Sequence, residues 1–292
     1  MTKPRLAVQL FSVYPSLAGD LPGTLHRIAE LGYDSVEPQS HTGTPMELYH
    51  YYARNLAESG MGPGGADQPE LPSVVEIKRA LDEAGLTAPS CHAYLPEGDA
   101  AEAILDEQEA LGSQLLVVGS IYDPTTDAPF DFSDLDGIKR VAERFNVAAE
   151  RARSRRIRIG YHNHFEEFHT KFDGRTGLEV FFDYCEPDVF AEVDTYWAQV
   201  GGRDPVELLT SLGERVELIH VKDGTGVWTN FGEPTVALGR GSLDVRSILD
   251  AASHASAFIV EIEWVMGDAI WEALAESHQF LVDHDPALGQ QA

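Results

Sequence analysis

The chain has 292 residues, of which 43% are hydrophobic and 24% charged, a balance typical of folded globular proteins and not of disordered ones. Acidic residues outnumber basic ones 48 to 21, and the formal net charge of −27 repels the phosphates of nucleic acids. No stretch approaches the roughly 18 apolar residues of a membrane span, and the N-terminal apolar run is too short for a signal peptide. We therefore expect neither a nucleic-acid nor a membrane partner.

The two cysteines, Cys91 and Cys185, lie far apart in the sequence, each inside an apolar stretch. Such cysteines are more often buried free thiols than a disulfide, and free thiols are typical of a reducing compartment. We therefore expect a cytoplasmic protein without a disulfide bond.

Short β-rich runs alternate with stretches of helical periodicity, which is typical of parallel strands joined by crossover helices. Eight strands are expected, at Leu6 to Phe11, Ser35 to Pro38, Thr87 to Ala93, Leu115 to Gly119, Arg158 to His162, Phe190 to Val193, Leu218 to Val221 and Phe258 to Glu263. Eight such units close most simply into a (β/α)8 TIM barrel, an α/β fold. A doubly wound open sheet is the alternative, although residues 11–14 lack the glycine-rich turn that usually follows its first strand.

Helical periodicity covers nine stretches, at Leu21 to Leu31, Leu48 to Ser59, Val74 to Ala84, Ala100 to Leu111, Leu135 to Arg153, Gly177 to Tyr184, Pro205 to Leu212, Val245 to Ala252 and Ile270 to Asp283. Gly32, Gly85 and Gly112 directly follow three of them, as left-handed C-terminal caps do. Residues 60–72 are expected to be a surface excursion or a flap. No change in composition divides residues 1–292, so we expect a single domain with a frayed tail at 286–292.

Side chains that can bind a metal end the last four predicted strands. They are His162, Asp194, His220 and Glu261, one on each strand. Singly, such a residue is more often a helix cap or a satisfied core group, but the strand ends of a barrel form one ring, so these four converge. Imidazoles with carboxylates suit one divalent ion, Mn²⁺, Zn²⁺, Co²⁺ or Fe²⁺, with positions left open for substrate oxygens. The sequence therefore predicts a metal site at this rim.

Five strings carry a family resemblance. They are Tyr161-His162-Asn163-His164, Asp194-Thr195-Tyr196-Trp197, Gly202-Arg203-Asp204-Pro205, His220-Val221-Lys222-Asp223 and Gly239-Arg240-Gly241. Together they resemble the sugar phosphate isomerase/epimerase family of xylose isomerase-like TIM barrels. The resemblance covers nearly the whole chain and implies that His162, Asp194, His220 and Glu261 hold the metal. Many epimerases of this group have a glutamate, both ligand and base, at the position of His162, and His164 is the alternative ligand on this strand.

The expected chemistry is proton abstraction next to a carbonyl, because a metal chelated by adjacent oxygens stabilises the resulting enediolate. Glu261, Glu263 and His162 are the candidate bases. Lys222 stabilises or protonates an oxyanion, unless it only forms an ion pair with Asp223. Reprotonation makes the protein a sugar isomerase or epimerase, whereas loss of a β-leaving group makes it a lyase or dehydratase of an inosose or 3-keto-glycoside. The alternative from another class is a non-catalytic sugar-binding barrel.

A small sugar or cyclitol is the expected partner. Its candidate contacts are Glu37, His92, Asn163, His164, Trp197, Glu263 and Trp264, which supply hydrogen bonds or an apolar stacking surface. Gly239-Arg240-Gly241 lacks the long glycine-rich loop of a phosphate cradle, so we interpret it as a turn. Arg240 leaves a phosphorylated sugar open, but the absence of a basic cluster favours an uncharged one. Barrels of this kind often pair, and the sequence leaves a homo-oligomer open.

Overall fold

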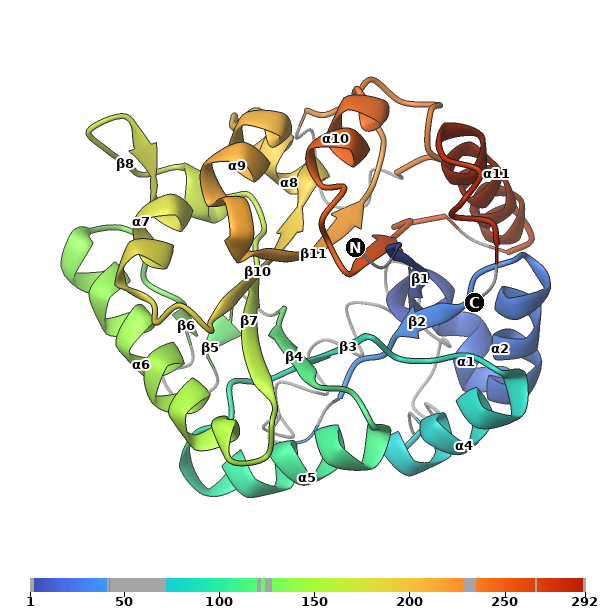
Figure 1. Cartoon of the computed structure of the whole chain (residues 1–292), viewed down its shortest axis with the longest axis horizontal. Coiled ribbons are helices and arrows are strands. Elements are labelled where there is room, and N and C mark those ends of the chain that lie inside the picture. Colours follow the sequence, from blue (N-terminus) through green and yellow to red (C-terminus); the bar gives the residue numbers. More distant parts are fainter. Residues whose placement is uncertain are drawn as a thin grey trace.

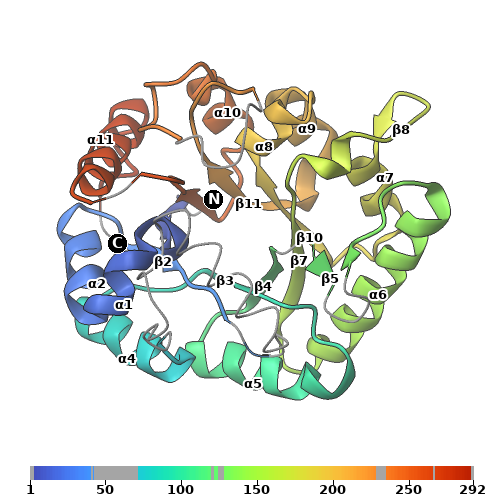
Figure 2. The same ribbon diagram turned by 180° about the vertical axis from the view of Figure 1, so that it is seen from behind.

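The computed structural model describes residues 3–40, 42, 72–119, 122–123, 128–227, 235–265 and 267–290. Eight parallel strands form a ring that helices surround, as seen from one end (Figure 1) and from behind (Figure 2). The strands are β1 (Arg5–Gln9), β2 (Ser35–Glu37), β3 (Ser90–Ala93), β4 (Leu115–Val118), β7 (Arg158–His162), β10 (Phe190–Asp194), β11 (Val216–Val221) and β12 (Ala257–Val260). Each overlaps a predicted strand, which confirms the TIM barrel.

Hydrogen-bonded neighbours follow the order β2-β1-β12-β11-β10-β7-β4-β3. The two end strands meet through parallel bridges between Ser35 and Thr87 and between Gln39 and His92. Every strand of the ring runs in the same direction, so all the C-terminal strand ends lie at one mouth. Asp194 pairs with His220 in the register of β10 and β11, which places two of the predicted site residues side by side at that mouth.

Eight of the nine predicted helices lie among the described residues. They are α2 (Leu21–Glu30), α4 (Val74–Ala84), α5 (Ala101–Leu111), α6 (Leu135–Arg153), α7 (Gly177–Tyr184), α9 (Pro205–Leu212), α10 (Val245–Ala251) and α11 (Ala269–His284). Gly32, Gly85 and Gly112 have φ values of 100°, 71° and 83°, as expected for left-handed caps. The predicted helix Leu48 to Ser59 and most of the excursion at 60–72 lie outside the described residues.

Several short elements were not predicted. They are the helices α1 (Tyr14–Gly19) and α8 (Thr195–Val200), the hairpins β5 (Tyr122–Asp123) with β6 (Ala128–Pro129) and β8 (Lys171–Phe172) with β9 (Arg175–Thr176), and the 3-10 turns η1 (Leu10–Val13), η2 (Gly98–Ala100), η3 (Glu166–Phe168) and η4 (Gly213–Arg215). Helix α8 begins directly at a strand end because Asp194 caps it, with Oδ1 accepting from the Trp197 amide at 2.8 Å. Within the tail predicted to fray, Leu288 is buried.

The core has two parts. The larger part lies between the strands and the helices, and a smaller cluster inside the barrel includes Val117, Phe190, Leu218 and Ile259. Cys91 and Cys185 are buried free thiols, as predicted. Among the described residues, no helix has both the length and the apolar character that crossing a bilayer requires.

Gly160 makes room for the aromatic ring that fills the bottom of the barrel. A Cβ at this position would lie 2.3 Å from a ring carbon of Phe190, on the neighbouring strand. We expect Gly160→Ala to lower the free energy of unfolding by about 1–3 kcal/mol, because an overpacked core must shift. Gly19→Ala is the matched control, since a Cβ at Gly19 meets nothing within 4 Å. Equal urea-unfolding midpoints for the two variants would contradict this packing.

Candidate active site at the barrel mouth

Side chains two residues apart on a strand point to the same side, so each strand sends alternate residues into the barrel. At the ends of the last three strands these pairs are Glu192 and Asp194, His220 and Lys222, and Glu261 and Glu263. The first member of each pair lies deeper and the second lies nearer the mouth. The polar interior begins directly above the apolar cluster that contains Phe190, Leu218 and Ile259.

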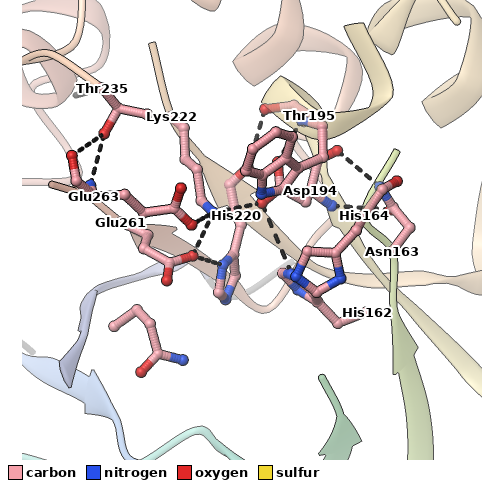
Figure 3. Close-up of polar contacts among 12 residues, drawn as sticks. His162, Asn163, His164, Asp194, Thr195, His220, Lys222, Thr235, Glu261 and Glu263 are labelled. Carbon is pink, nitrogen blue, oxygen red and sulfur yellow. Dashed lines mark hydrogen bonds and ion pairs between the residues drawn. The ribbon is translucent and has the colours of Figure 1, made fainter. Parts of the chain in front are cut away.

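The Lys222 ammonium group lies among three carboxylates, and we call these four residues the rim cluster: Lys222, Asp194, Glu261 and Glu263 (Figure 3). Lys222 Nζ is 2.8 Å from Asp194 Oδ2 and 2.6 Å from Glu261 Oε2. Glu263 Oε1 lies 2.7 Å from the same nitrogen. Lys222 is 1% exposed, so these carboxylates replace the water that solvates an exposed lysine.

A second layer lies below, and we call it the deep cluster: His92, His162, Glu192 and His220. Glu192 Oε2 is 2.7 Å from His92 Nε2 and 3.0 Å from His162 Nδ1. The same oxygen is 3.3 Å from His220 Nε2. The His92 and His220 rings stack with their centroids 5.3 Å apart and an interplanar angle of 7°. Three imidazoles from three strands therefore surround one buried carboxylate oxygen.

His220 joins the two layers. Its Nδ1 lies 2.8 Å from Glu261 Oε2, and its Nε2 lies 2.7 Å from Glu37 Oε2. Glu37 is fully buried and accepts hydrogen bonds from Gln9 Nε2 at 2.8 Å and from the Ser90 hydroxyl. Both Glu37 oxygens therefore have protein partners, and the carboxylate fixes the orientation of the His220 ring.

The deep cluster combines charged and neutral imidazoles. Burial lowers the pKa of His92 and His220, but Glu37 and Glu192 outweigh burial and raise both values, that of His92 to about 10. Burial and the charge of Glu37 raise the pKa of Glu192 to about 7. Burial and the neighbouring imidazole of His220 lower the pKa of His162 well below its usual value. His162 is therefore neutral at pH 7, with a nitrogen lone pair available for a ligand.

The two glutamates on Lys222 have opposite pKa shifts. Burial disfavours charge on Lys222, but Asp194 and Glu261 outweigh it and raise the lysine pKa well above its usual value. Burial raises the pKa of Glu261, yet Lys222 and His220 together hold it well below the ordinary range. Burial and the charge of Glu261 raise the pKa of Glu263 to about 7 despite Lys222. Glu261 is therefore ionised, whereas Glu263 exchanges a proton near neutral pH.

Two overlapping groups of described residues have a spacing that can hold a metal ion. One is the deep cluster, and the other is Asp194, His220 and Glu261; within each group the ligand atoms lie within 4.8 Å of one another. Every residue of the predicted ligand set belongs to at least one group. Glu192 Oε1 is buried without a hydrogen-bond partner, which a bound cation would explain. These imidazole and carboxylate donors fit a divalent transition metal.

The residues predicted to contact substrate divide between the mouth and the framework. Asn163 ties β7 to β10, because its side chain bonds both the amide and the carbonyl of Asp194, each at 3.1 Å. His164 and Trp197 lie together at the mouth with ring centroids 6.2 Å apart. Trp264 is half-buried and has a left-handed backbone with φ 63°, directly after Glu263. The rings of His164 and Trp197 thus lie beside each other at the mouth.

Sequence reasoning missed Glu192, the residue at the centre of the deep cluster, and Gln9 beside Glu37. Glu192 precedes Asp194 by two positions on one strand, so the period of two already places both side chains inside the barrel. Gln9 carries the same signal, because it ends the first strand with its side chain on the inner face. The other three members of the deep cluster, His92, His162 and His220, are among the predicted site residues.

The alternative of an ion pair between Lys222 and Asp223 is wrong. Adjacent residues at a strand end point to opposite sides, and Asp223 Oδ2 instead accepts hydrogen bonds from the amides of Gly239 and Gly241, each at 2.9 Å. A carboxylate of the protein thus holds the Gly239-Arg240-Gly241 turn, as expected for a turn that is not a phosphate cradle. Arg240 pairs with Glu276 on the exposed surface.

A closed ring of eight parallel strands, with side chains at its C-terminal mouth whose spacing could hold a metal ion, defines a TIM barrel with its candidate site in the position usual for enzymes of this fold. The sequence profile of the xylose isomerase-like TIM barrels matches residues 25–284, and the chain belongs to this family.

Solved structures similar to this chain include a sugar phosphate isomerase/epimerase from Parabacteroides distasonis, with 24% identity, a TM-score of 0.72 and coverage of 99% of this chain and 96% of that one. A D-allulose 3-epimerase from Methylomonas sp. has 14% identity and a TM-score of 0.63 over 97% and 99%. A probable 3-DHS dehydratase from Bacillus anthracis has 12% identity and a TM-score of 0.61 over 95% and 98%. No curated protein matches the sequence. At these identities, the likenesses to solved structures show the fold alone.

Proposed function

We propose that the protein is a metal-dependent sugar isomerase or epimerase that abstracts a proton next to a carbonyl and passes through an enediolate. The observation that carries the proposal is the convergence of two metal-capable groups on His220, directly below a lysine that bridges two glutamates. The ion draws its ligands from His162, Asp194, His220 and Glu261 together with the deeper His92 and Glu192. A divalent ion bound here supplies the positive charge that stabilises an enediolate.

The rim cluster supplies the proton transfer. Glu263 has a side chain 12% exposed at the mouth and a pKa of about 7, so near neutral pH it can both accept and return a proton. Lys222 holds Glu263 Oε1 at 2.7 Å and stays charged, which positions the base and places an ammonium group beside a developing oxyanion. His164 and Trp197 exclude water from one side of the site and stack against the sugar.

The position of Glu263 is fixed through its backbone. The Glu263 amide donates to Thr235 Oγ1 at 2.7 Å, and the Glu263 carbonyl accepts from the Thr235 amide at 3.1 Å. These two bonds attach the end of β12 to residue 235, in the connection that follows β11 (Figure 3). Because both the amide and the carbonyl of Glu263 are hydrogen-bonded, this base keeps a constant distance to a bound substrate, which proton transfer requires.

Deuterium exchange tests the proposal directly. Metal-loaded protein is incubated in deuterated water with unphosphorylated ketoses and inososes, and ¹H NMR follows the carbon next to the carbonyl. We expect deuterium to enter at that carbon, and removal of the metal with a chelator to abolish the exchange. Metal-independent sugar binding with no exchange in any keto-sugar would instead support a non-catalytic sugar-binding barrel.

A second candidate is a lyase or dehydratase acting on an inosose or 3-keto-glycoside. Glu261 and Glu263 both extend from β12, whereas β7 presents the imidazoles of His162 and His164. An epimerase that uses a carboxylate on each face of the sugar needs a second carboxylate where these imidazoles lie, but elimination does not. An unsaturated product or a released aglycone in the same NMR experiment favours this candidate, and a clean epimer rules against it.

A further inference from the structure

We propose that Asp223 and Thr235 are positioning residues for Glu263, and that they act through residues 235–243, which we call the connecting segment. The inference rests on the proposed function, in which Glu263 transfers the proton. It adds what holds Thr235 itself in place, and it gives a role to Asp223, whose carboxylate points away from the site. Both residues act on the backbone of Glu263 and not on a substrate.

The two glutamates of the rim cluster lie beyond the last paired residue of β12. This strand pairs with β1 and β11 up to Val260, and β1 then continues into the turn η1. Buried hydroxyls replace the strand partners from there on. Ser12 Oγ accepts from the Ile262 amide at 2.9 Å, and Thr235 Oγ1 accepts from the Glu263 amide at 2.7 Å. The backbone that directs both glutamates to the same side therefore depends on these side chains.

The backbone directly after Glu263 is strained. Trp264 has a φ of 63°, a left-handed conformation that bulky residues rarely adopt. Such a conformation persists only where the surrounding contacts hold it. The Glu263 carbonyl, which precedes this residue, accepts from the Thr235 amide at 3.1 Å. We therefore expect the turn to relax, and Glu263 to move, when the contact with Thr235 is lost.

Asp223 attaches the connecting segment to the end of β11. Its carbonyl accepts from the amide of Val236, the residue after Thr235, at 2.9 Å. Its carboxylate accepts from four backbone amides, those of Gly224 (2.8 Å), Gly239 (2.9 Å), Gly241 (2.9 Å) and Leu243 (3.2 Å). Asp223 is fully buried, so these amides replace the water that solvates an exposed carboxylate. One residue thus holds both ends of the segment.

The connecting segment links the residue next to the lysine of the rim cluster with the proposed base. Asp223 follows Lys222 directly in the sequence, and Lys222 Nζ lies 2.7 Å from Glu263 Oε1. The segment packs closely against Asp223, because a Cβ on Gly241 would lie 2.1 Å from Asp223 Oδ1. A segment held this tightly at β11 and at Glu263 fixes the distance between the lysine and the base.

Residue-resolved hydrogen exchange of the metal-loaded protein tests the inference without any substrate. In the wild-type protein, we expect the Glu263 amide to be protected. Asp223→Asn puts an NH₂ group among the amides of the segment, and it should accelerate exchange of the Glu263 amide at least about tenfold. Faster exchange confined to residues 235–243, or a Glu263 amide unprotected in the wild type, would overturn the proposal. The wild-type measurement does not depend on whether a variant folds.

Kinetics of three threonine variants give a second readout, with the rate of deuterium entry into the keto-sugar that the wild-type enzyme exchanges. Thr235→Val should lower kcat at least about tenfold and change KM less than about threefold, because the base is displaced while sugar binding persists. Thr235→Ser keeps the accepting hydroxyl and should restore kcat to within about threefold. Thr210→Val is the control, since Thr210 is exposed on α9 and bonds the Val206 carbonyl.

A double variant shows whether Thr235 acts through Glu263. Once the base is removed by Glu263→Gln, adding Thr235→Val should lower the residual rate no further. Additive losses, or a wild-type rate in Thr235→Val while Glu263→Gln is slow, would overturn this inference and leave the proposed function standing. Full activity in Glu263→Gln would instead contradict the proton transfer on which both rest.

Discussion

Replacement of His220 by alanine is expected to abolish both metal binding and turnover. His220 is the one residue shared by the two metal-capable groups, since its Nδ1 faces Glu261 and its Nε2 faces Glu37 and Glu192. The variant should fall from about one equivalent of metal to none in elemental analysis, and its deuterium exchange should drop by at least about a thousandfold. This expectation holds whichever group binds the ion.

Folding must be checked in the same variant, because the imidazole is fully buried and its removal takes one hydrogen-bond partner from each of Glu37 and Glu261. Far-ultraviolet circular dichroism and the unfolding midpoint separate loss of the ion from loss of the barrel. His254→Ala is the control, since His254 is exposed and contacts the carbonyl of Gly213 far from the mouth. A folded His220→Ala protein that retains one equivalent of metal would contradict the site.

The barrel could be predicted from the sequence because its signals are local. The apolar runs of the strands, the helical periodicity and the glycines after three helices each depend on a few neighbouring residues. The predicted ends of α4, α6, α7 and α9 coincide with those in the structure. The short helix α8 was missed because Asp194 was assigned only a metal-binding role, whereas its Oδ1 also caps that helix.

The site could be predicted only in outline, because its contacts join residues from distant parts of the chain. The ring of strand ends indicated which strands contribute, and each of the four predicted ligands belongs to at least one of the two metal-capable groups. Which atoms meet depends on closure of the barrel. Glu37 reaches His220 across 183 positions, and no local pattern indicates that contact.

Lys222 shows the same limit. Its neighbour in the sequence, Asp223, suggested a local ion pair, but the strand directs these two side chains to opposite sides. Its actual partners come from β10 and from the end of β12. How deep a side chain lies in the barrel depends on how the strands are staggered against one another, which the sequence does not show. Glu37, predicted to contact substrate, is instead fully buried beneath the site, where it accepts a hydrogen bond from Gln9.

Replacement of Glu263 by glutamine is expected to lower kcat by about a hundredfold to ten-thousandfold with no loss of bound metal. Glu263 belongs to neither metal-capable group, and glutamine keeps an oxygen that accepts from Lys222. In the wild-type enzyme, kcat/KM should rise with pH through about 7, because a base must first lose its own proton and the pKa of Glu263 is about 7. The glutamine variant should lack that rise.

Glu276→Gln is the matched control, because Glu276 pairs with Arg240 at the exposed surface and should leave the rate and its pH profile unchanged. Elemental analysis of Glu263→Gln decides how a loss of activity is interpreted. Loss with one equivalent of metal retained assigns the proton transfer to Glu263, because Glu261, the other glutamate on Lys222, has a pKa far too low to hold a proton near neutrality. Full activity in Glu263→Gln would contradict this assignment and leave Glu261 and His162 as the candidate bases. The pH dependence of kcat/KM would then report the pKa of the group that acts.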